Sequence, residues 1–190
     1  NIRGGGEFGP AWHQAGLKTN RQLIYDDFIA VAEDLIARKI TSPRRLGIQG
    51  GSNGGLLMGV MLNQRPDLFE AALVEVPLLD MLRYDQLLAG ASWVDEYGSP
   101  ANAQERAWLE RMSPYQNLRA RADFPIPFIL TSTKDDRVHP GHARKYLFHY
   151  GNGDPFSTFY PCNTIGVLAF LLISNSANCD SLLSICFSFP

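Results

Sequence analysis

The 190-residue sequence is poor in cysteine and has no long hydrophobic segment. Its three cysteines, Cys162, Cys179 and Cys186, cannot all pair within one chain, and their spacing matches no zinc motif. The longest apolar run, residues 165–173, is about half of the roughly 20 residues that are needed to cross a bilayer. Asn1 is not followed by the apolar core of a signal peptide, so we expect the chain to begin inside a larger protein.

An excess of charge of either sign is also missing. The net charge is −2, and 45% of the residues are hydrophobic and 19% charged, which is typical of a soluble globular protein. This balance gives no reason to propose nucleic acid or a membrane as a partner. The length suffices for one domain with a real core. No targeting segment is visible, so we expect a cytoplasmic location, and no feature of the sequence sets an oligomeric state.

Positive charge disappears in the last part of the chain. Every lysine and arginine lies at or before Lys145, whereas residues 151–190 carry only Asp154 and Asp180 as charges and contain all the cysteines. We therefore predict two regions, a globular domain over 1–150 and an atypical tail over 151–190. The tail is either a genuine but unusual or disordered segment, or the product of a shifted reading frame or a mis-joined exon, and the composition favours the second explanation.

The motif around which the chain is organised is Gly-Gly-Ser-Asn-Gly-Gly at residues 50–55. It follows the short apolar run 46–48 and precedes the apolar stretch 56–62, which is the strand–turn–helix context of a G-x-S-x-G elbow. We therefore expect Ser52 to be a nucleophile in a strained turn, with the backbone N–H of Asn53 at a helix N-terminus donating to an oxyanion.

The glycines that flank the serine fit an elbow, and one alternative interpretation of the motif is weaker. A Cβ at Gly50 or Gly54 is expected to crowd the close approach of strand and helix. The alternative is an ordinary glycine-rich turn that binds a phosphate. The run has no G-K-[ST] ending, so it is not a P-loop, and Ser52 and Asn53 interrupt a G-x-G-x-x-G pattern.

Hydrophobic periodicity predicts strands that alternate with helices. Asp26 and Asp27 are expected in the first turn of the first long helix. Alternation of this kind predicts an α/β fold with a mostly parallel, doubly wound sheet flanked by helices, whose ligands bind at the carboxyl ends of the strands. The predicted helices are 27–38, 56–62, 103–112 and 141–150, and the predicted strands are 45–49, 71–76 and 126–132.

The loop after the third strand supplies an acid for Ser52. Asp135 comes later in the chain than the serine and lies at the same sheet edge, although turn and helix-capping chemistry also explains an Asp-Asp pair there. A catalytic triad then needs a histidine beyond Asp135. His139 and His142 are so close that they belong to the same loop and helix start, and His149 suits a helix C-terminus. We identify no triad histidine; His13 precedes the serine and is less suitable still.

Four segments together resemble the catalytic domain of the prolyl oligopeptidase family of serine peptidases. The resemblance covers about residues 1–150 and implies a partial α/β-hydrolase domain, incomplete at both ends. It also implies cleavage of short peptides, typically after proline, through an acyl-enzyme on Ser52, with no metal or organic cofactor. The four segments are Asn-Ile-Arg-Gly-Gly-Gly-Glu-Phe-Gly at 1–9, the serine motif at 50–55, Asn-Gln-Arg-Pro-Asp-Leu-Phe at 63–69 and Asp-Asp-Arg-Val at 135–138.

The resemblance assigns roles residue by residue. Ser52 matches the nucleophile, Asp135 the triad acid and Asn53 the backbone oxyanion donor. Arg137 matches the arginine that holds a carbonyl oxygen of the bound peptide, which suits a guanidinium with several donors. Trp93 and Tyr97 resemble the residues of the proline pocket, where an aromatic ring can stack on the pyrrolidine ring; without the resemblance they would be interpreted as ordinary core or surface aromatics.

The sequence also departs from the family pattern. Family members have a β-propeller and further strands before this region, including a tyrosine that is the second oxyanion donor, and they place the triad histidine some tens of residues after the aspartate. Here that interval is the tail, which contains no histidine. The chain is therefore expected to be a truncated, inactive peptidase. The alternatives are a non-catalytic peptide-binding protein and an esterase or acyl hydrolase of the same fold.

Overall fold

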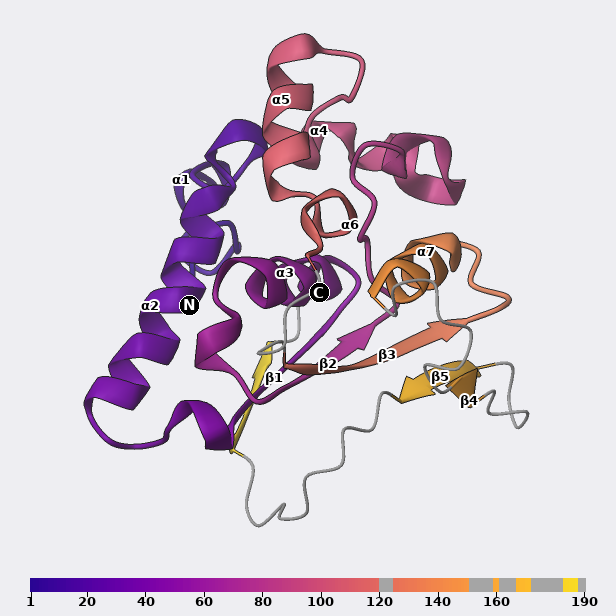
Figure 1. The fold of residues 1–190 in the computed structure, drawn as a ribbon. Coiled ribbons are helices and arrows are strands. Elements are labelled where there is room, and N and C mark those ends of the chain that lie inside the picture. Colours follow the sequence, from indigo (N-terminus) through magenta and orange to yellow (C-terminus); the bar gives the residue numbers. More distant parts are fainter. Residues whose placement is uncertain (120–124, 151–158, 161–166, 172–182, 188–190) are drawn as a thin grey trace.

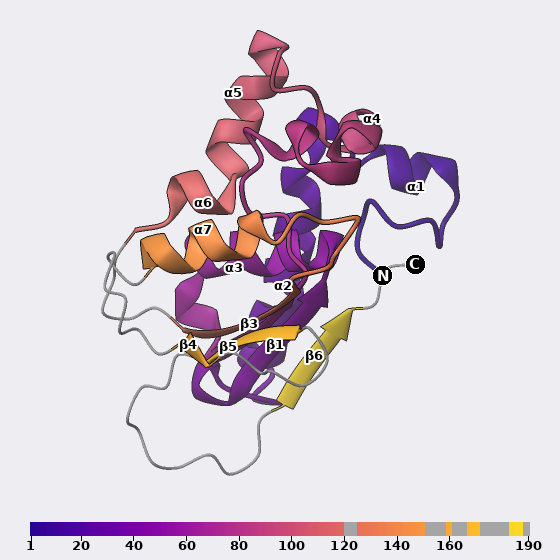
Figure 2. The ribbon, with the colours of Figure 1, turned by 90° about the vertical axis from the view of Figure 1, so that its right-hand side faces the viewer.

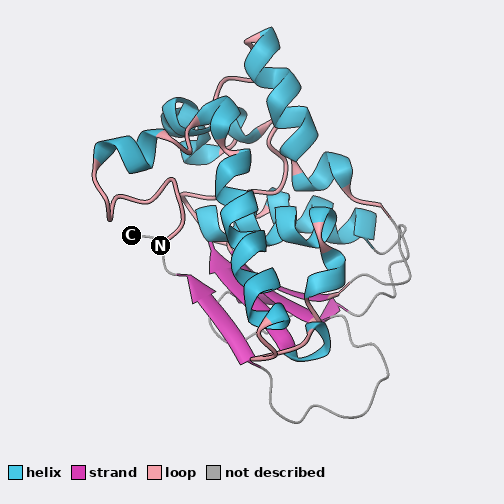
Figure 3. Cartoon of the chain, turned by 90° about the vertical axis from the view of Figure 1, so that its left-hand side faces the viewer, coloured by secondary structure: helices cyan, strands magenta, loops and turns pink. Residues whose placement is uncertain are grey.

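The computed structural model describes residues 1–119, 125–150, 159–160, 167–171 and 183–187 (Figure 1). Its strands form one sheet in the order β4-β5-β3-β2-β1-β6. Figure 3 shows the strands lying together and helices making up much of the rest of the chain. The strands are β1 (Leu46–Gly51), β2 (Ala71–Glu75), β3 (Ile126–Ser132), β4 (Phe159–Tyr160), β5 (Val167–Leu171) and β6 (Leu183–Phe187).

The sheet is mostly parallel, as the sequence predicts. β1 pairs with β2 and β2 with β3 in parallel, with Gly47 opposite Ala71 and Ala71 opposite Ile126. β6 adds a parallel strand beside β1, whereas β5 pairs antiparallel with β3 and β4 antiparallel with β5. The carboxyl ends of β1, β2 and β3 therefore meet at one edge, where the loops that follow them come together.

Two helices cover the centre of the sheet on the same face. α3 contacts β1 and β2, α7 contacts β3, and both lie above the strands in Figures 1 and 2. α2 and α6 pack against α3 in turn. The helices are α1 (Pro10–Gln14), α2 (Gln22–Ala37), α3 (Asn53–Gln64), α4 (Val94–Tyr97), α5 (Ala103–Met112), α6 (Pro114–Asn117) and α7 (Gly141–Tyr150), with short 3₁₀ turns at Lys18–Asn20, Pro43–Arg45, Pro66–Leu68, Tyr84–Gln86 and Leu88–Trp93.

The core is built around α3, in which every residue from Gly54 to Leu62 is buried. Close packing of this helix on β1 depends on a small residue, because a Cβ on Gly50 would lie 2.5 Å from the carbonyl oxygen of Gly54. The predicted crowding at Gly50 is thus confirmed. A Cβ on Gly51 would meet nothing closer than 3.6 Å, so only the first of the two glycines is required by contact.

Several predicted elements are confirmed in their bounds; β1, β2 and α3 differ from their predicted limits by one to three residues, and α2 is wrong at its start. β3, α5 and α7 have the predicted limits. α2 begins at Gln22, about a turn earlier than predicted, because Ile24 and Tyr25 extend its buried face. Asp26 and Asp27 therefore do not lie in its first turn. Asp27 instead accepts hydrogen bonds from the backbone N–H and the Nε of Arg3, at 2.9 and 2.8 Å.

Part of the predicted tail takes part in the sheet. β4, β5 and β6 all come from residues after 150, and β5 and β6 pair with strands of the predicted domain. The origin of the tail and the division of the chain at residue 150 stay predictions. Among the described residues, no helix is both long and apolar enough to traverse a bilayer.

Candidate active site

Ser52 forms the whole turn between β1, which ends at Gly51, and α3, which begins at Asn53. Its φ of 54° and ψ of −112° lie where residues other than glycine are seldom found. The Ser52 N–H donates to the carbonyl of Glu75 at 2.9 Å, and the Leu56 N–H donates to the carbonyl of Ser52 at 3.1 Å. A serine held in such a conformation between a strand and a helix has the geometry of a nucleophile elbow.

Asn53, the first residue of α3, has two distinct groups at this turn. Its backbone N–H belongs to the first helical turn, whose N–H groups have no acceptor within the helix and favour a nearby anion. Its side-chain Oδ1 accepts hydrogen bonds from the Tyr97 hydroxyl, at 3.1 Å, and from Nη2 of Arg21. The residue next to the serine is therefore fixed by two partners from other segments.

Arg21 lies beneath this turn and is only 2% exposed. Its Nη1 donates to Oε1 of Glu96 at 2.9 Å, and its guanidinium carbon lies 4.4 Å from the centre of the Tyr97 ring. Burial opposes the positive charge, but attraction to Tyr25, Tyr97 and Glu96 outweighs it, so the pKa of Arg21 is raised. Burial also raises the pKa of Tyr97, which therefore remains a neutral hydrogen-bond donor.

Asp135 follows β3 in the loop 133–140 and is half-buried. Its Oδ1 accepts hydrogen bonds from the backbone N–H groups of Arg137, at 3.0 Å, and Val138, at 2.8 Å. These contacts are the turn chemistry that the sequence allows for this aspartate. They hold the loop in shape and leave a second carboxylate oxygen for another partner.

Arg137 connects the loop 133–140 to the serine. Its Nη2 donates to Oγ of Ser52 at 3.2 Å, and its carbonyl accepts a long hydrogen bond of 3.4 Å from the N–H of Ala89. The segment of Ala89 continues to Trp93 and then to α4, which ends at Tyr97. The structure thus brings together the serine turn, the aspartate loop and the aromatic segment, as the carboxyl ends of parallel strands require.

Trp93 and Tyr97 differ in how much surface they offer. Tyr97 is 4% exposed, with Arg21 on its ring and Tyr84 edge-on at 5.5 Å between centroids. Trp93 is half-buried against the edge of the hydrophobic core. Within the described residues, no hydrogen bond or ring contact joins Trp93 to the other residues of the site. Tyr97 is accordingly a fixed wall, and Trp93 the more accessible of the two rings.

The four histidines all have other partners. Nδ1 of His13 lies 2.7 Å from the carbonyl of Gly4, Nδ1 of His139 accepts from the N–H of Gly141 at 2.9 Å, and the ring of His149 lies 5.6 Å from that of Tyr115. In the described part of the chain, no hydrogen bond joins any histidine to Ser52 or Asp135.

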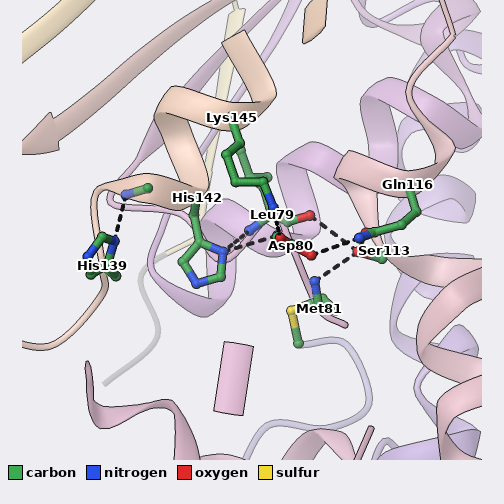
Figure 4. A network of polar contacts seen from close by, with 9 residues as sticks. Leu79, Asp80, Met81, Ser113, Gln116, His139, His142 and Lys145 are labelled. Carbon is green, nitrogen blue, oxygen red and sulfur yellow. Dashed lines mark hydrogen bonds and ion pairs between the residues drawn. The ribbon is translucent and has the colours of Figure 1, made fainter. Parts of the chain in front are cut away.

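His142 is the most deeply buried of them, at 1% exposed (Figure 4). Its Nδ1 accepts from the backbone N–H groups of Leu79, at 3.3 Å, and Asp80, at 3.0 Å. Burial lowers the pKa of His142 to about 4, so the ring is neutral at neutral pH. Because Nδ1 of His142 already accepts from the backbone of the segment after β2, His142 holds the start of α7 against that segment.

Asp80 adds further contacts between α7 and the same segment (Figure 4). Its carboxylate is fully buried, with Oδ1 accepting from Nε2 of Gln116 at 2.7 Å and Oδ2 paired with Nζ of Lys145. Lys145 also lies 4.4 Å from the centre of the Tyr115 ring. The start of α7, and with it the far end of the loop 133–140, is thereby tied to the segment that leads from β2 to Trp93.

Metal sites and cavities are two other kinds of place where a ligand could bind. Among the described residues, no group of three or more histidine, cysteine, aspartate or glutamate side chains is arranged to hold a metal ion. A small cavity lies at the opposite end of α3 from Ser52, so it is not part of the serine site. It is lined by Val60, Asn63, Gln64, Arg111, Met112, Asn117 and Arg119.

A mostly parallel sheet with a strained serine between β1 and the helix that follows defines an α/β hydrolase. The chain belongs to the prolyl oligopeptidase family, whose sequence pattern matches residues 1–149. An uncharacterized peptidase, y4nA, of Sinorhizobium fredii is 65% identical over 145 residues, and the prolyl endopeptidase of Dictyostelium discoideum is 45% identical over 148 residues. These alignments cover 76% and 77% of this chain but 20% of each relative, so the chain spans about a fifth of their length.

Solved structures that resemble this chain include members of the same family. A post-proline cleaving enzyme of Rickettsia typhi is 47% identical with a TM-score of 0.77, and the alignment covers 82% of this chain and 22% of that one. Prolyl oligopeptidase B of Galerina marginata is 35% identical with the same TM-score of 0.77, over 82% of this chain and 22% of that one. The α/β-hydrolase fold that the sequence predicts is therefore confirmed.

Arg21 is the residue of the site that sequence reasoning missed. A signal for it exists, because Arg21, Tyr25, Phe28 and Ala32 follow helical spacing and are all buried. A charged residue at the start of such a stripe is normally assigned to solvent. Its burial depends on Glu96 and Tyr97, which lie more than seventy residues away in sequence.

Proposed function

We propose that this chain is the part of a serine peptidase that carries the nucleophile Ser52 and the acid Asp135, for hydrolysis of short peptides after proline. The observation that carries the proposal is the strained turn at Ser52, whose Oγ is reached by Arg137 from the loop of Asp135. A relative supports a peptide as the substrate: a serine-to-alanine variant of the Galerina marginata enzyme, 36% identical, has been solved bound to a 35mer hydrolysis and macrocyclization substrate.

In the proposed reaction, Ser52 Oγ attacks the carbonyl carbon of the proline residue, and its proton passes to a base. The carbonyl oxygen becomes an oxyanion, which the N–H of Asn53 stabilises. The C–N bond then breaks, the leaving amine takes the proton, and an ester on Ser52 remains for water to hydrolyse. Arg137, whose Nη2 donates to Ser52 Oγ at 3.2 Å, has further N–H donors with which to bind a peptide carbonyl.

The proline side chain is proposed to lie between Trp93 and the fixed wall of Tyr97. A flat ring stacks well on a pyrrolidine ring, and the half-buried Trp93 has a face to offer. The buried Tyr97 contributes mainly shape, because Arg21 and Tyr84 already occupy positions around its ring. Replacing Trp93 is therefore expected to weaken proline binding more than replacing Tyr97 by phenylalanine.

We propose that the 190-residue chain by itself does not turn over peptides. Each of its four histidines is engaged elsewhere, His142 by two backbone N–H groups. Loss of a triad base leaves only a small residue of catalysis. A non-catalytic peptide-binding role is the second proposal, since the exposed Arg137 and the half-buried Trp93 need no base to bind a peptide.

A peptidyl boroproline tests the nucleophile without requiring turnover. Boron accepts a lone pair from Ser52 Oγ, the hydroxyl proton leaves to solvent, and the adduct imitates the tetrahedral intermediate. We expect the affinity measured by calorimetry to fall at least about tenfold in Ser52→Ala and to stay unchanged in the matched Ser42→Ala variant. A boroleucine analogue that bound as well as boroproline would contradict the proline pocket.

A fluorogenic proline peptide tests the absence of turnover. The purified chain is expected to show no hydrolysis above the Ser52→Ala background. Hydrolysis at an ordinary enzyme rate that Ser52→Ala abolished would contradict the proposed inactivity and require a base among the four histidines. Calorimetry with unmodified proline peptides tests the second role: binding without turnover that is lost in Arg137→Ala supports a peptide-binding protein, and no binding at millimolar peptide would contradict it.

A further inference from the structure

Arg21 has a buried charge that the proposed reaction does not use. Its side chain is 2% exposed, and its Nε is buried without a hydrogen-bond partner among the described residues. A buried, partly unsatisfied cation costs stability, so its presence at this point calls for a compensating interaction. The compensation comes from Glu96, from the ring of Tyr97 and from the side chain of Asn53.

These partners all belong to the neighbourhood of the serine turn. Asn53 directly follows Ser52, and its Oδ1 accepts from both Arg21 and Tyr97. Glu96 and Tyr97 lie on α4, so one guanidinium joins the start of α3 to α4. Asn53 can therefore rotate only if two hydrogen bonds break together.

The strain at Ser52 explains why such a restraint is useful. A residue other than glycine at φ 54° persists only where its surroundings over-determine it. The two backbone bonds of Ser52 fix the turn on the sheet side, to Glu75, and on the helix side, to Leu56. The contact from Arg21 to Asn53 adds a third, side-chain restraint on the residue that immediately follows.

We propose that Arg21 is a positioning residue for the nucleophile turn, holding Asn53, and through it the oxyanion N–H and Ser52, in the reactive arrangement. Its planar guanidinium does this by donating to Asn53 and Glu96 from separate nitrogens while stacking on Tyr97. The inference rests on the proposed function for its catalytic meaning, but the restraint itself is a property of the turn.

Residue-specific hydrogen exchange of the full chain tests the restraint. The reporters are the amides of Ser52 and Leu56, which donate to Glu75 and Ser52, and the reference is the amide of Glu70, which donates to Leu46 at the other end of β1 at 2.9 Å. In Arg21→Met, the reporters are expected to exchange about tenfold or more faster relative to the reference. Arg21→Lys keeps the charge but not the planar fork, and is expected to give a smaller acceleration in the same direction.

Arg65→Met is the matched control, because Arg65, like Arg21, is held by two side-chain partners, in its case the carboxylates of Glu33 and Asp67, far from the turn. It is expected to leave the exchange ratio unchanged. Equal acceleration of reporters and reference in both Arg21 variants would reduce Arg21 to a general stabiliser and overturn the proposal. Arg21→Lys provides the test if Arg21→Met does not fold.

Boroproline binding separates this inference from the proposed function. If Arg21 positions the turn, Arg21→Lys is expected to lose about tenfold in affinity, and Arg65→Met less than about twofold. Faster local exchange in a chain that binds no boroproline would support the restraint and contradict the peptidase. Undiminished boroproline affinity in Arg21→Lys, together with unchanged exchange ratios, would contradict the positioning role of Arg21 but not the proposed peptidase function.

Discussion

The serine turn and the aspartate loop lie at the same sheet edge but are held in different ways. The turn at Ser52 is strained and has buried supports, with Arg21 below it and α3 packed on β1. The loop 133–140 is only partly buried and is held by its own aspartate and by contacts at its far end, where His142 and Lys145 meet the segment of Asp80. The serine turn thus depends on packing together with buried hydrogen bonds, whereas the aspartate loop depends on its own hydrogen bonds and on the contacts of α7.

The largest expected effect lies on the side of the serine turn. Gly50→Ala places a Cβ 2.5 Å from the carbonyl oxygen of Gly54, which is backbone and cannot move aside. We expect a loss of about 3 kcal/mol in the free energy of unfolding, measured with urea. Gly51→Ala is the control, since its nearest neighbour would be 3.6 Å away. Equal losses in both variants would show that helix–strand contact does not determine the choice of glycine.

The next largest effect is expected where α7 is held against the segment of Asp80, at the far end of the loop 133–140. Asp80→Asn keeps the shape but removes the negative charge beside Lys145, and we expect it to cost about 2 kcal/mol. Glu110→Gln removes a charge from an exposed pair with Arg106 and is expected to cost less than about 0.5 kcal/mol. Urea unfolding of both variants makes the comparison, and a negligible loss in Asp80→Asn would mean that the buried pair does not hold the loop.

The pH dependence of stability tests the contact of His142 with the same segment. Its pKa is lowered to about 4 in the folded chain, so between that pH and about 6.5 the unfolded chain binds more protons and stability rises with pH. From pH 7.5 to pH 5 we expect a loss of about 2 kcal/mol from this group. His142→Asn keeps an acceptor for the backbone without titrating, so its stability is expected to change less over that range. Parallel curves for the two proteins would contradict the assignment.

The smallest effect is expected within the loop 133–140 itself. Asp135→Ala removes the acceptor for two backbone N–H groups and is expected to cost about 1 kcal/mol. Asp135→Asn retains an oxygen and is expected to cost less than about 0.5 kcal/mol. Thermal unfolding of the two variants provides the measurement. A loss in Asp135→Asn as large as that in Asp135→Ala would show that the charge, rather than the acceptor, shapes the loop.

Much of the fold could be predicted because it depends on local patterns. The bounds of β3 and α7 follow from an apolar run and a helical stripe, and the strand–turn–helix at Ser52 follows from its glycines and their flanking apolar residues. The early start of α2 escaped prediction because it depends on the burial of Ile24 and Tyr25 against distant segments. Tertiary contacts of this kind leave only a weak local signal.

The sequence allows the candidate site residues to be proposed, but not the residues that support them. Ser52, Asp135 and Arg137 are recognisable from motif and chain order, and the structure brings their segments together. The pairing of Arg21 with Asn53 and of Asp80 with Lys145 could not be predicted, because nothing in a sequence specifies which distant partner a charged residue meets. Burial of a charge is decided by the whole fold.

Boron-11 NMR of the chain with a peptidyl boroproline is the most direct test of Ser52 as the nucleophile. At neutral pH the free boronate is trigonal, and a bond to Ser52 Oγ makes the boron tetrahedral. We expect a tetrahedral signal with the wild-type chain that disappears in Ser52→Ala and persists in Ser42→Ala. A tetrahedral signal that survived Ser52→Ala, or no such signal with the wild-type chain at saturating boronate, would contradict the assignment.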